Sequence, residues 1–289
     1  MTHRPSVLSV GRVYCDLIFT DLPRLPTMGT EIYAGGFGVH AGGGAFITAA
    51  HLASLGHASA LSAMLPPRPF GGLLAEDLER AGIGLQLCQT LQGRDEPQVT
   101  VALVGQQDRA FVTRRSGPAF PALEVSDLTG IGATHVHIGE LATLIERPDI
   151  IALARGAGAT ISLDCSWDDG LAATDIAAAI ADVDVFLPNE AEVQHLIDIG
   201  VPLSQFPLTA IKQGSAGATA LVKGERLHEP AKSVTVVDTT GAGDAFNAGF
   251  VSAWLAGEAL QTCLRAGNAQ GAKAITRRGG FHRAATGKA

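Results

Sequence analysis

The chain has 289 residues, of which 46% are hydrophobic and 17% are charged, and its formal net charge is -7. This composition excludes an intrinsically disordered protein, and the absence of a basic stripe argues against nucleic acid or an anionic membrane as a partner. The four cysteines, Cys15, Cys88, Cys165 and Cys263, form no CxxC pair, so we expect reduced thiols. Without a signal-peptide pattern or an apolar run of about 18 residues, a cytoplasmic protein is expected.

The first half of the chain predicts strands and helices separated by glycines. Ser6–Val10 is a short apolar run typical of a buried strand, and residues 44–55 have a helical pattern that ends before Gly56. A strand is expected at 59–65 and a second helix at 72–81. Residues 98–115 alternate between apolar and polar around GQQD, which indicates a hairpin with one solvent-exposed face.

The second half predicts four strands, each followed by a polar or glycine residue. The segments are THVHIGE, ATISLDCS, DVDVFLPNE and PLTAIKQGS, and the residues that follow the strands are Gly139, Asp164, Asn189 and Gly214. Helical stretches between these segments favour a mostly parallel sheet covered by helices. Ligands bind such sheets at the carboxyl ends of the strands, so we expect the functional groups to meet at this edge.

The stretch VVDTTGAGDAF, residues 236–246, carries the strongest chemical signal. The β-branched residues 233–237 predict a strand that leads into it, and a helix is expected after it. The free N–H groups of Gly241, Ala242 and Gly243 would then form an anion site at the positive end of the helix dipole. Asp244 beside this site is suited to remove a proton from a hydroxyl that attacks phosphorus, because phosphoryl transfer needs positioning, charge neutralisation and a proton acceptor.

DTTGAGDAFNAGF resembles the signature of the ribokinase-like, or PfkB-type, carbohydrate kinases. The glycines of AGGGAFITAAHLASLG, then PNEAE, KQGSAGA and GNAQGAKAITRRGG, follow the order found in that family and extend the resemblance over almost the whole chain. The resemblance implies one α/β domain over residues 1–289, with a three-layer ribokinase-like fold and a mostly parallel sheet flanked by helices. A small β-sheet lid formed by about residues 14–40 and 97–116 is implied as well.

The implied activity is transfer of the γ-phosphate of ATP to a hydroxyl of a sugar or sugar-like molecule, with Mg²⁺ and in many members a monovalent cation such as K⁺. By resemblance, Asp244 is the general base and Gly241, Ala242 and Gly243 form the anion hole. Nucleotide contacts are implied for Lys212, Gly214, Asn268 and Asn189. Metal contacts are implied for Asn189 and Glu192 with Mg²⁺ and for Asp238 and Thr240 with the monovalent cation. Sugar contacts are implied for Asp16, Gly42 and Gly43, and a homodimer is expected by analogy with the family.

Several of these residues have a simpler interpretation. Asn189 and Glu192 also fit an N-cap and a first-turn acid of the following helix. Asp16 also fits a solvated residue at a strand end, and Lys212 also fits a surface charge. Asp164 either faces the site or forms a turn.

The sequence departs from the family pattern in the segment that binds the sugar. Ile47 stands where the family has an Asn, and Thr48 becomes the counterpart if the extra glycine shifts the frame. Isoleucine has no hydrogen-bonding group, so one hypothesis is that Ile47 lines the substrate pocket and selects an acceptor with an apolar edge. The other is that Ile47 packs in the core and Thr48 faces the acceptor.

Parts of the sequence also fit three other functions. A nucleoside kinase of the same fold and a non-catalytic sugar-binding regulatory protein both stay open, although a pure binder has no need of Asp244. A dinucleotide-dependent oxidoreductase is disfavoured. GFGVHA, residues 36–41, fits G-x-G-x-x-A, but we expect a loop there, and no acid lies about 20 residues further on.

Overall fold

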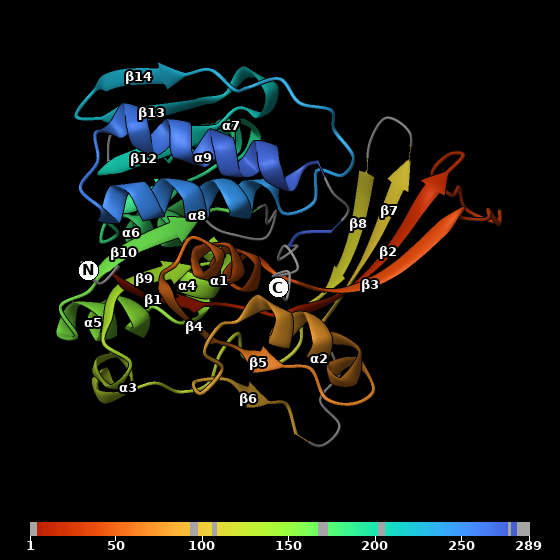
Figure 1. The fold of residues 1–289 in the computed structure, drawn as a ribbon, viewed down its shortest axis with the longest axis horizontal. Helices are drawn as coiled ribbons and strands as arrows, with labels where there is room; N and C mark the ends of the chain where they lie inside the picture. Colours follow the sequence, from red (N-terminus) through yellow and green to blue (C-terminus); the bar gives the residue numbers. More distant parts are fainter. Residues whose placement is uncertain are drawn as a thin grey trace, which may run out of the picture.

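The computed structural model describes residues 5–92, 98–105, 109–166, 173–201, 206–276 and 279–281. Its largest sheet has eight strands in the order β14-β13-β12-β11-β10-β9-β1-β4 (Figure 1). Their bounds are Ser6–Val10 (β1), Ala58–Ser62 (β4), Ala133–Ile138 (β9), Thr160–Asp164 (β10), Val185–Leu187 (β11), Leu208–Lys212 (β12), Ala218–Val222 (β13) and Glu225–Glu229 (β14). The six strands β4, β1, β9, β10, β11 and β12 run parallel to one another. At the edge beyond β12, β13 pairs antiparallel with β12 and β14 pairs antiparallel with β13.

Helices cover both faces of this sheet, because its strands carry apolar residues on both sides. In β1, Leu8 and Val10 pack toward one core with α3 to α7, whereas Val7 packs toward a second core with α8 and α9. The bounds are Val125–Gly130 (α3), Leu141–Glu146 (α4), Asp149–Gly156 (α5), Ala173–Ile180 (α6), Glu190–Asp198 (α7), Ala242–Leu255 (α8) and Leu260–Ala274 (α9). The helices α1 (Gly44–Ser54) and α2 (Phe70–Ala81) belong to a third apolar cluster. The result is the three-layer α/β arrangement expected from the sequence.

A separate sheet of four strands projects from one end of the main body (Figure 1). Its order is β3-β2-β7-β8, with bounds Tyr14–Leu22 (β2), Gly36–Gly42 (β3), Val99–Gly105 (β7) and Arg109–Arg114 (β8). The strands β7 and β8 pair antiparallel, as the alternating pattern predicts. A short two-stranded sheet, Met64–Leu65 (β5) with Gln89–Thr90 (β6), completes the fold.

Two expectations about local structure are wrong. Residues 233–237 form no strand; Val234, Val236 and Val237 are exposed, and the amide of Val237 donates to the carbonyl of Ile275 at 2.8 Å. The β-branched residues lie along a pocket instead, as described below. GFGVHA is not a loop but most of β3, which pairs with β2 along its whole length.

The structure also describes the cysteines and the length and polarity of the helices. All four cysteines are free thiols. Within the part of the chain that the structure describes, no helix is long and apolar enough to cross a bilayer.

Candidate active site

A pocket of about 970 Å³ lies at the carboxyl ends of the parallel strands. Its walls come from the residues after β9, β10, β11 and β12, the loop before α1, the start of α8, the inner face of α9 and the segment 231–236. Most of the predicted site residues meet there: Gly43, Asn189, Glu192, Lys212, Gly214, Gly241, Ala242, Gly243, Asp244 and Asn268. The position follows from topology, because parallel strands bring their carboxyl ends to a single edge.

Asp244 lies in the first turn of α8 and faces Gly44, the first residue of α1. A Cβ atom built on Gly44 would come within 3.1 Å of Asp244 Oδ1 and 2.6 Å of the carbonyl oxygen of Gly139. A side chain at position 44 would therefore collide with the carbonyl of Gly139 and crowd the carboxylate of Asp244. Burial raises the pKa of Asp244 to about 7, with Asp164 adding to the shift and Lys212 opposing it. A carboxyl group with a pKa near neutrality is suited to general base catalysis.

The start of α8 has the unsatisfied amides that an anion site requires. Gly241 is the N-cap and has a φ of 71°, a left-handed conformation that favours glycine, and it packs against the backbone of Gly280. The amides of Gly243 and Asp244 have no hydrogen-bond partner among the described residues. The amide of Ala242 donates to the carbonyl of Thr239 at 3.3 Å. Of the three predicted amides, only that of Ala242 is therefore engaged by a backbone carbonyl among the described residues.

Lys212 is not a surface charge. Its Nζ donates to Asp164 Oδ1 at 2.8 Å and to Asn247 Oδ1 at 3.2 Å, and only 13% of its side chain is exposed. Asp164 faces the site, while its Oδ1 also accepts from the amide of Cys165 at 2.9 Å. Asn247, which the sequence analysis missed, lies three residues after Asp244 on the same face of α8, and this spacing is the signal that marks it.

Asn189 and Glu192 form a reciprocal capping box at the start of α7. Asn189 Oδ1 accepts from the amide of Glu192 at 2.9 Å, and Glu192 Oε2 accepts from the amide of Asn189 at 2.7 Å. Both residues line the pocket as well. Burial raises the pKa of Glu192; Lys212 opposes the shift and Asp164 adds to it. The two side chains therefore have the structural role that the simpler interpretation assigned, and they present hard oxygen atoms to the pocket.

Asp238 and Thr240 lie just outside the pocket wall. Asp238 accepts hydrogen bonds from the amides of Thr240 at 2.9 Å and Gly279 at 2.8 Å. Thr240 Oγ1 is buried without a hydrogen-bond partner among the described residues. An orphaned hydroxyl beside a carboxylate is a fitting pair of ligands for a cation. Among the described residues there is no group of three or more His, Cys, Asp or Glu side chains that could hold a metal ion.

Asp16 and Gly42, for which sugar contacts were expected, lie beside each other outside the pocket lining. Asp16 packs against Gly42, where a Cβ atom would come within 2.0 Å of its carboxylate. Burial raises the pKa of Asp16 to about 7, and a hydrogen bond from Thr100 opposes the shift. Neither Asp16 nor Gly42 is among the described residues that line the pocket.

Ile47 and Thr48 do not line the pocket either. Ile47 is 4% exposed and belongs to the apolar cluster of α1, where it meets Gly280. Thr48 is fully buried, and its hydroxyl donates to the backbone carbonyl of Asp244 at 3.4 Å. The burial of both side chains favours the hypothesis that Ile47 packs in the core, and it leaves Thr48 without exposure to the pocket.

Tyr14 and Glu140 are pocket residues that the sequence analysis missed. Glu140 is 4% exposed and forms an ion pair with Arg115 at 3.7 Å. Burial raises the pKa of Glu140, and Arg115 opposes this shift. The pKa of the Tyr14 hydroxyl is also raised, chiefly by burial and then by Glu140. The position of Glu140 directly after a predicted strand was the available signal.

Comparison with known proteins decides the family. The model of the pfkB family carbohydrate kinases matches residues 4–284. The chain belongs to the PfkB family of carbohydrate kinases. It is a sugar or nucleoside kinase, a phosphotransferase with an alcohol group as acceptor. The kinase is 31% identical over 284 residues to an ATP-dependent ribose-1-phosphate kinase from Halopiger xanaduensis, covering 94% of this chain and 93% of that protein.

Solved structures agree with the ribokinase-like fold of this kinase. A ribokinase from Arabidopsis thaliana, in complex with ribose and ATP, matches with a TM-score of 0.78 and 23% identity, covering 96% of this chain and 94% of that one. A nucleoside kinase from Methanocaldococcus jannaschii also matches with a TM-score of 0.78, at 19% identity, with coverage of 96% and 94%. At these identities the likeness shows the fold.

Proposed function

We propose that this PfkB-family kinase transfers the γ-phosphate of ATP to a hydroxyl of a small sugar or nucleoside, with Asp244 as the general base. The observation that carries the proposal is the position of Asp244. Its carboxyl group, with a pKa of about 7, lies at the start of α8, where the amides of Gly243 and Asp244 have no partner among the described residues. The names of the relatives, which include kinases of ribose, ribose 1-phosphate and nucleosides, support this class of acceptor.

The proposed reaction needs few groups from the protein. Asp244 accepts the proton of the acceptor hydroxyl, whose oxygen then forms a bond to the γ-phosphorus as the bond to the β-phosphate oxygen breaks. The amides at the start of α8 and the positive end of its dipole stabilise the charge on the transferred phosphoryl group. Gly44 leaves space beside the carboxylate of Asp244, and Gly139 lets the loop after β9 pack against the start of α1. In this scheme Lys212, Gly214 and Asn268 lie on the nucleotide side of the pocket.

The acidic character of the pocket supports a role for Mg²⁺. Glu140, Asp164, Glu192 and Asp244 all line it, and a triphosphate is repelled by carboxylates unless a cation intervenes. Asn189 and Glu192 would hold the ion, with water molecules completing a ligand set of hard oxygens. When bound, the ion neutralises charge on the phosphates.

A monovalent cation is proposed beside the anion site. Asp238 and Thr240 would bind it, and the buried, unpartnered hydroxyl of Thr240 is the supporting observation. Such an ion would stabilise the turn that precedes α8. Asp238 already accepts hydrogen bonds there from the amide of Thr240 and from the amide of Gly279 near the end of the chain.

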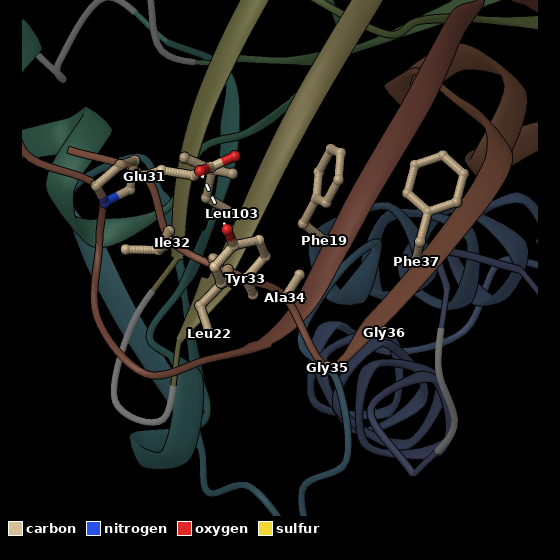
Figure 2. A pocket seen from close by; sticks show the side chains of 11 residues that line it. Phe19, Leu22, Glu31, Ile32, Tyr33, Ala34, Gly35, Gly36, Phe37 and Leu103 are labelled. Carbon is tan, nitrogen blue, oxygen red and sulfur yellow. Dashed lines mark hydrogen bonds between the residues drawn. The ribbon is translucent and has the colours of Figure 1, made fainter. Parts of the chain in front are cut away.

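We further propose that the four-stranded sheet is a lid and that two copies of the chain associate through it. Phe111 of β8 lines the pocket, so the sheet reaches the site. Its outer part has an apolar pocket of about 680 Å³, in which Phe19, Tyr33 and Phe37 are prominent (Figure 2). Phe37 and Tyr33 are 61% and 79% exposed. Exposed aromatic side chains of this number favour association with a second apolar surface.

An ADP-release assay over a panel of sugars, sugar phosphates, nucleosides and related alcohols tests the function. We expect acceptor-dependent ADP release that requires Mg²⁺, with at least one sugar or nucleoside as a good substrate. ADP release that no member of the panel stimulates would contradict the proposal and favour a non-catalytic binding protein.

A further inference from the structure

A closed ring of buried polar contacts lies next to the anion site. Lys212 Nζ donates to Asp164 Oδ1 at 2.8 Å and to Asn247 Oδ1 at 3.2 Å, and Asn247 Nδ2 donates to Asp164 Oδ2 at 2.8 Å. The three side chains come from β12, β10 and α8, so the ring joins the sheet to the helix that carries Asp244. Three mutual contacts leave the ammonium group little freedom to move.

Lys212 has one N–H donor left with which it can bind a ligand in the pocket. An ammonium group has three N–H donors, and the ring uses two of them. A Cβ atom built on Gly243 would lie 3.4 Å from Lys212 Nζ, so the ammonium lies against the first turn of α8. The unpartnered amides of Gly243 and Asp244 belong to that same turn.

The charge of Lys212 is preserved in this environment. Burial opposes the ammonium form, but Asp164 and Glu192 outweigh it and raise the pKa of Lys212 above its usual value. Among the described residues that line the pocket, the other cation is Lys232, which is exposed. Lys212 is therefore the fixed positive charge at the point where negative charge develops during phosphoryl transfer.

We propose that Lys212 is a catalytic residue that donates a hydrogen bond to the transferred phosphoryl group, and that Asp164 and Asn247 are positioning residues that hold it. Lys212 keeps its proton throughout and forms no covalent bond. This inference rests on the proposed function, and it gives Lys212 a different role from the nucleotide contact that the resemblance implies.

The main rival is that Lys212 only neutralises Asp164. Removing one partner of a buried ion pair leaves the other charge uncompensated, so a single substitution harms the protein under either explanation. A double variant with Lys212→Met and Asp164→Asn, in which both side chains are uncharged, distinguishes the two explanations. If Lys212 only neutralises Asp164, this double variant regains function. If Lys212 acts on the phosphoryl group, the double variant stays as impaired as Lys212→Met alone.

The test measures Mg²⁺–ADP binding by calorimetry with and without fluoroaluminate, which mimics the phosphoryl group in the transition state of its transfer. In the wild type, fluoroaluminate should tighten ADP binding by about tenfold or more, because transition-state analogues bind more tightly than ground-state ligands. Lys212→Met and the double variant should both lose most of this tightening, because removal of one oxyanion donor typically costs about 10²–10³-fold. Their affinity for ADP alone should stay close to wild type.

A matched control removes a lysine that lies away from the site. Lys223 is exposed in the turn between β13 and β14 and has a φ of 50°, which asparagine tolerates, so Lys223→Asn should behave as wild type. Circular dichroism and thermal unfolding establish that each variant is folded. Asp164→Asn alone should give an intermediate loss of the fluoroaluminate effect, because Lys212 keeps its charge and loses only its anchor.

The outcomes separate the inference from the function on which it rests. A fluoroaluminate effect that survives in folded Lys212→Met, or that returns in the double variant, would overturn the role of Lys212 and leave the proposed function intact. A wild type without any fluoroaluminate effect would contradict phosphoryl transfer at this pocket and the inference with it.

Discussion

Replacing Ile47 with asparagine should destabilise the protein without changing the order of its preferred acceptors. Ile47 is 4% exposed in the cluster around α1, and its Cδ1 atom would lie 2.7 Å from a Cβ atom on Gly280. Loss of a buried isoleucine side chain costs about 1.5–3 kcal/mol, and an unpaired buried amide adds about 1–3 kcal/mol. The free energy of unfolding should therefore fall by roughly 3–5 kcal/mol, a large share of the about 5–15 kcal/mol that stabilises a typical protein.

Urea denaturation and kcat/KM over the acceptor panel measure the two effects separately. Ile47→Val is the matched control, since it keeps the apolar contact and should cost only about 0.5–1.5 kcal/mol. Thr48→Val removes the 3.4 Å hydrogen bond to the carbonyl of Asp244 and should lower kcat modestly for every acceptor alike. The reasoning would be refuted if Ile47→Asn kept wild-type stability and promoted a different acceptor to the top of the panel.

Four further predictions concern the metal, the base, the lid and self-association. Glu192→Gln should raise the Mg²⁺ concentration needed for half-maximal turnover, and full activity in excess EDTA would argue against any metal site there. Because Asp244 must be ionised to act and its pKa is about 7, kcat/KM should fall about tenfold per unit as the pH drops below about 7; a flat profile down to pH 5 would count against this base. Phe111→Ser, at the point where the lid reaches the pocket, should raise KM for the acceptor, whereas an unchanged KM would speak against a lid role. Phe37→Ser should weaken self-association and lower the average molecular mass measured by light scattering. A mass equal to that of the wild type would contradict the proposed interface.

The sequence was most informative where function depends on topology. The segments that lead to Gly139, Asp164, Asn189 and Gly214 form parallel strands, and their carboxyl ends line one pocket, as expected. The alternation of strands and helices along the chain determines this arrangement, because each crossover returns the next strand in the same direction. The starts of α1 and α8 were predictable for a similar reason, since local glycine patterns mark them.

The sequence was least informative where tertiary contacts override local propensity. Residues 233–237 have the β-branched composition of a strand, yet several of them line the pocket and pair with no strand. The orientation of Ile47 and Thr48 depends on how α1 packs against α8 and Gly280. A sequence motif does not predict this tertiary packing. The ring of Lys212, Asp164 and Asn247 joins residues up to 83 positions apart, and no periodicity connects them.

Replacement of Asp244 by asparagine tests the central claim most directly. The account predicts that turnover of the best acceptor falls by about 10²–10⁴-fold, while the dissociation constant for Mg²⁺–ATP changes little. Because burial raises the pKa of this carboxyl from 3.8 to about 7 in the folded protein, its ionisation lowers stability progressively between these pH values and fully above about 7, so the amide should not lower the melting temperature at pH 8. Asp198→Asn, at an exposed acid of α7, is the matched control and should retain full turnover. Turnover near the wild-type rate in folded Asp244→Asn would contradict the account.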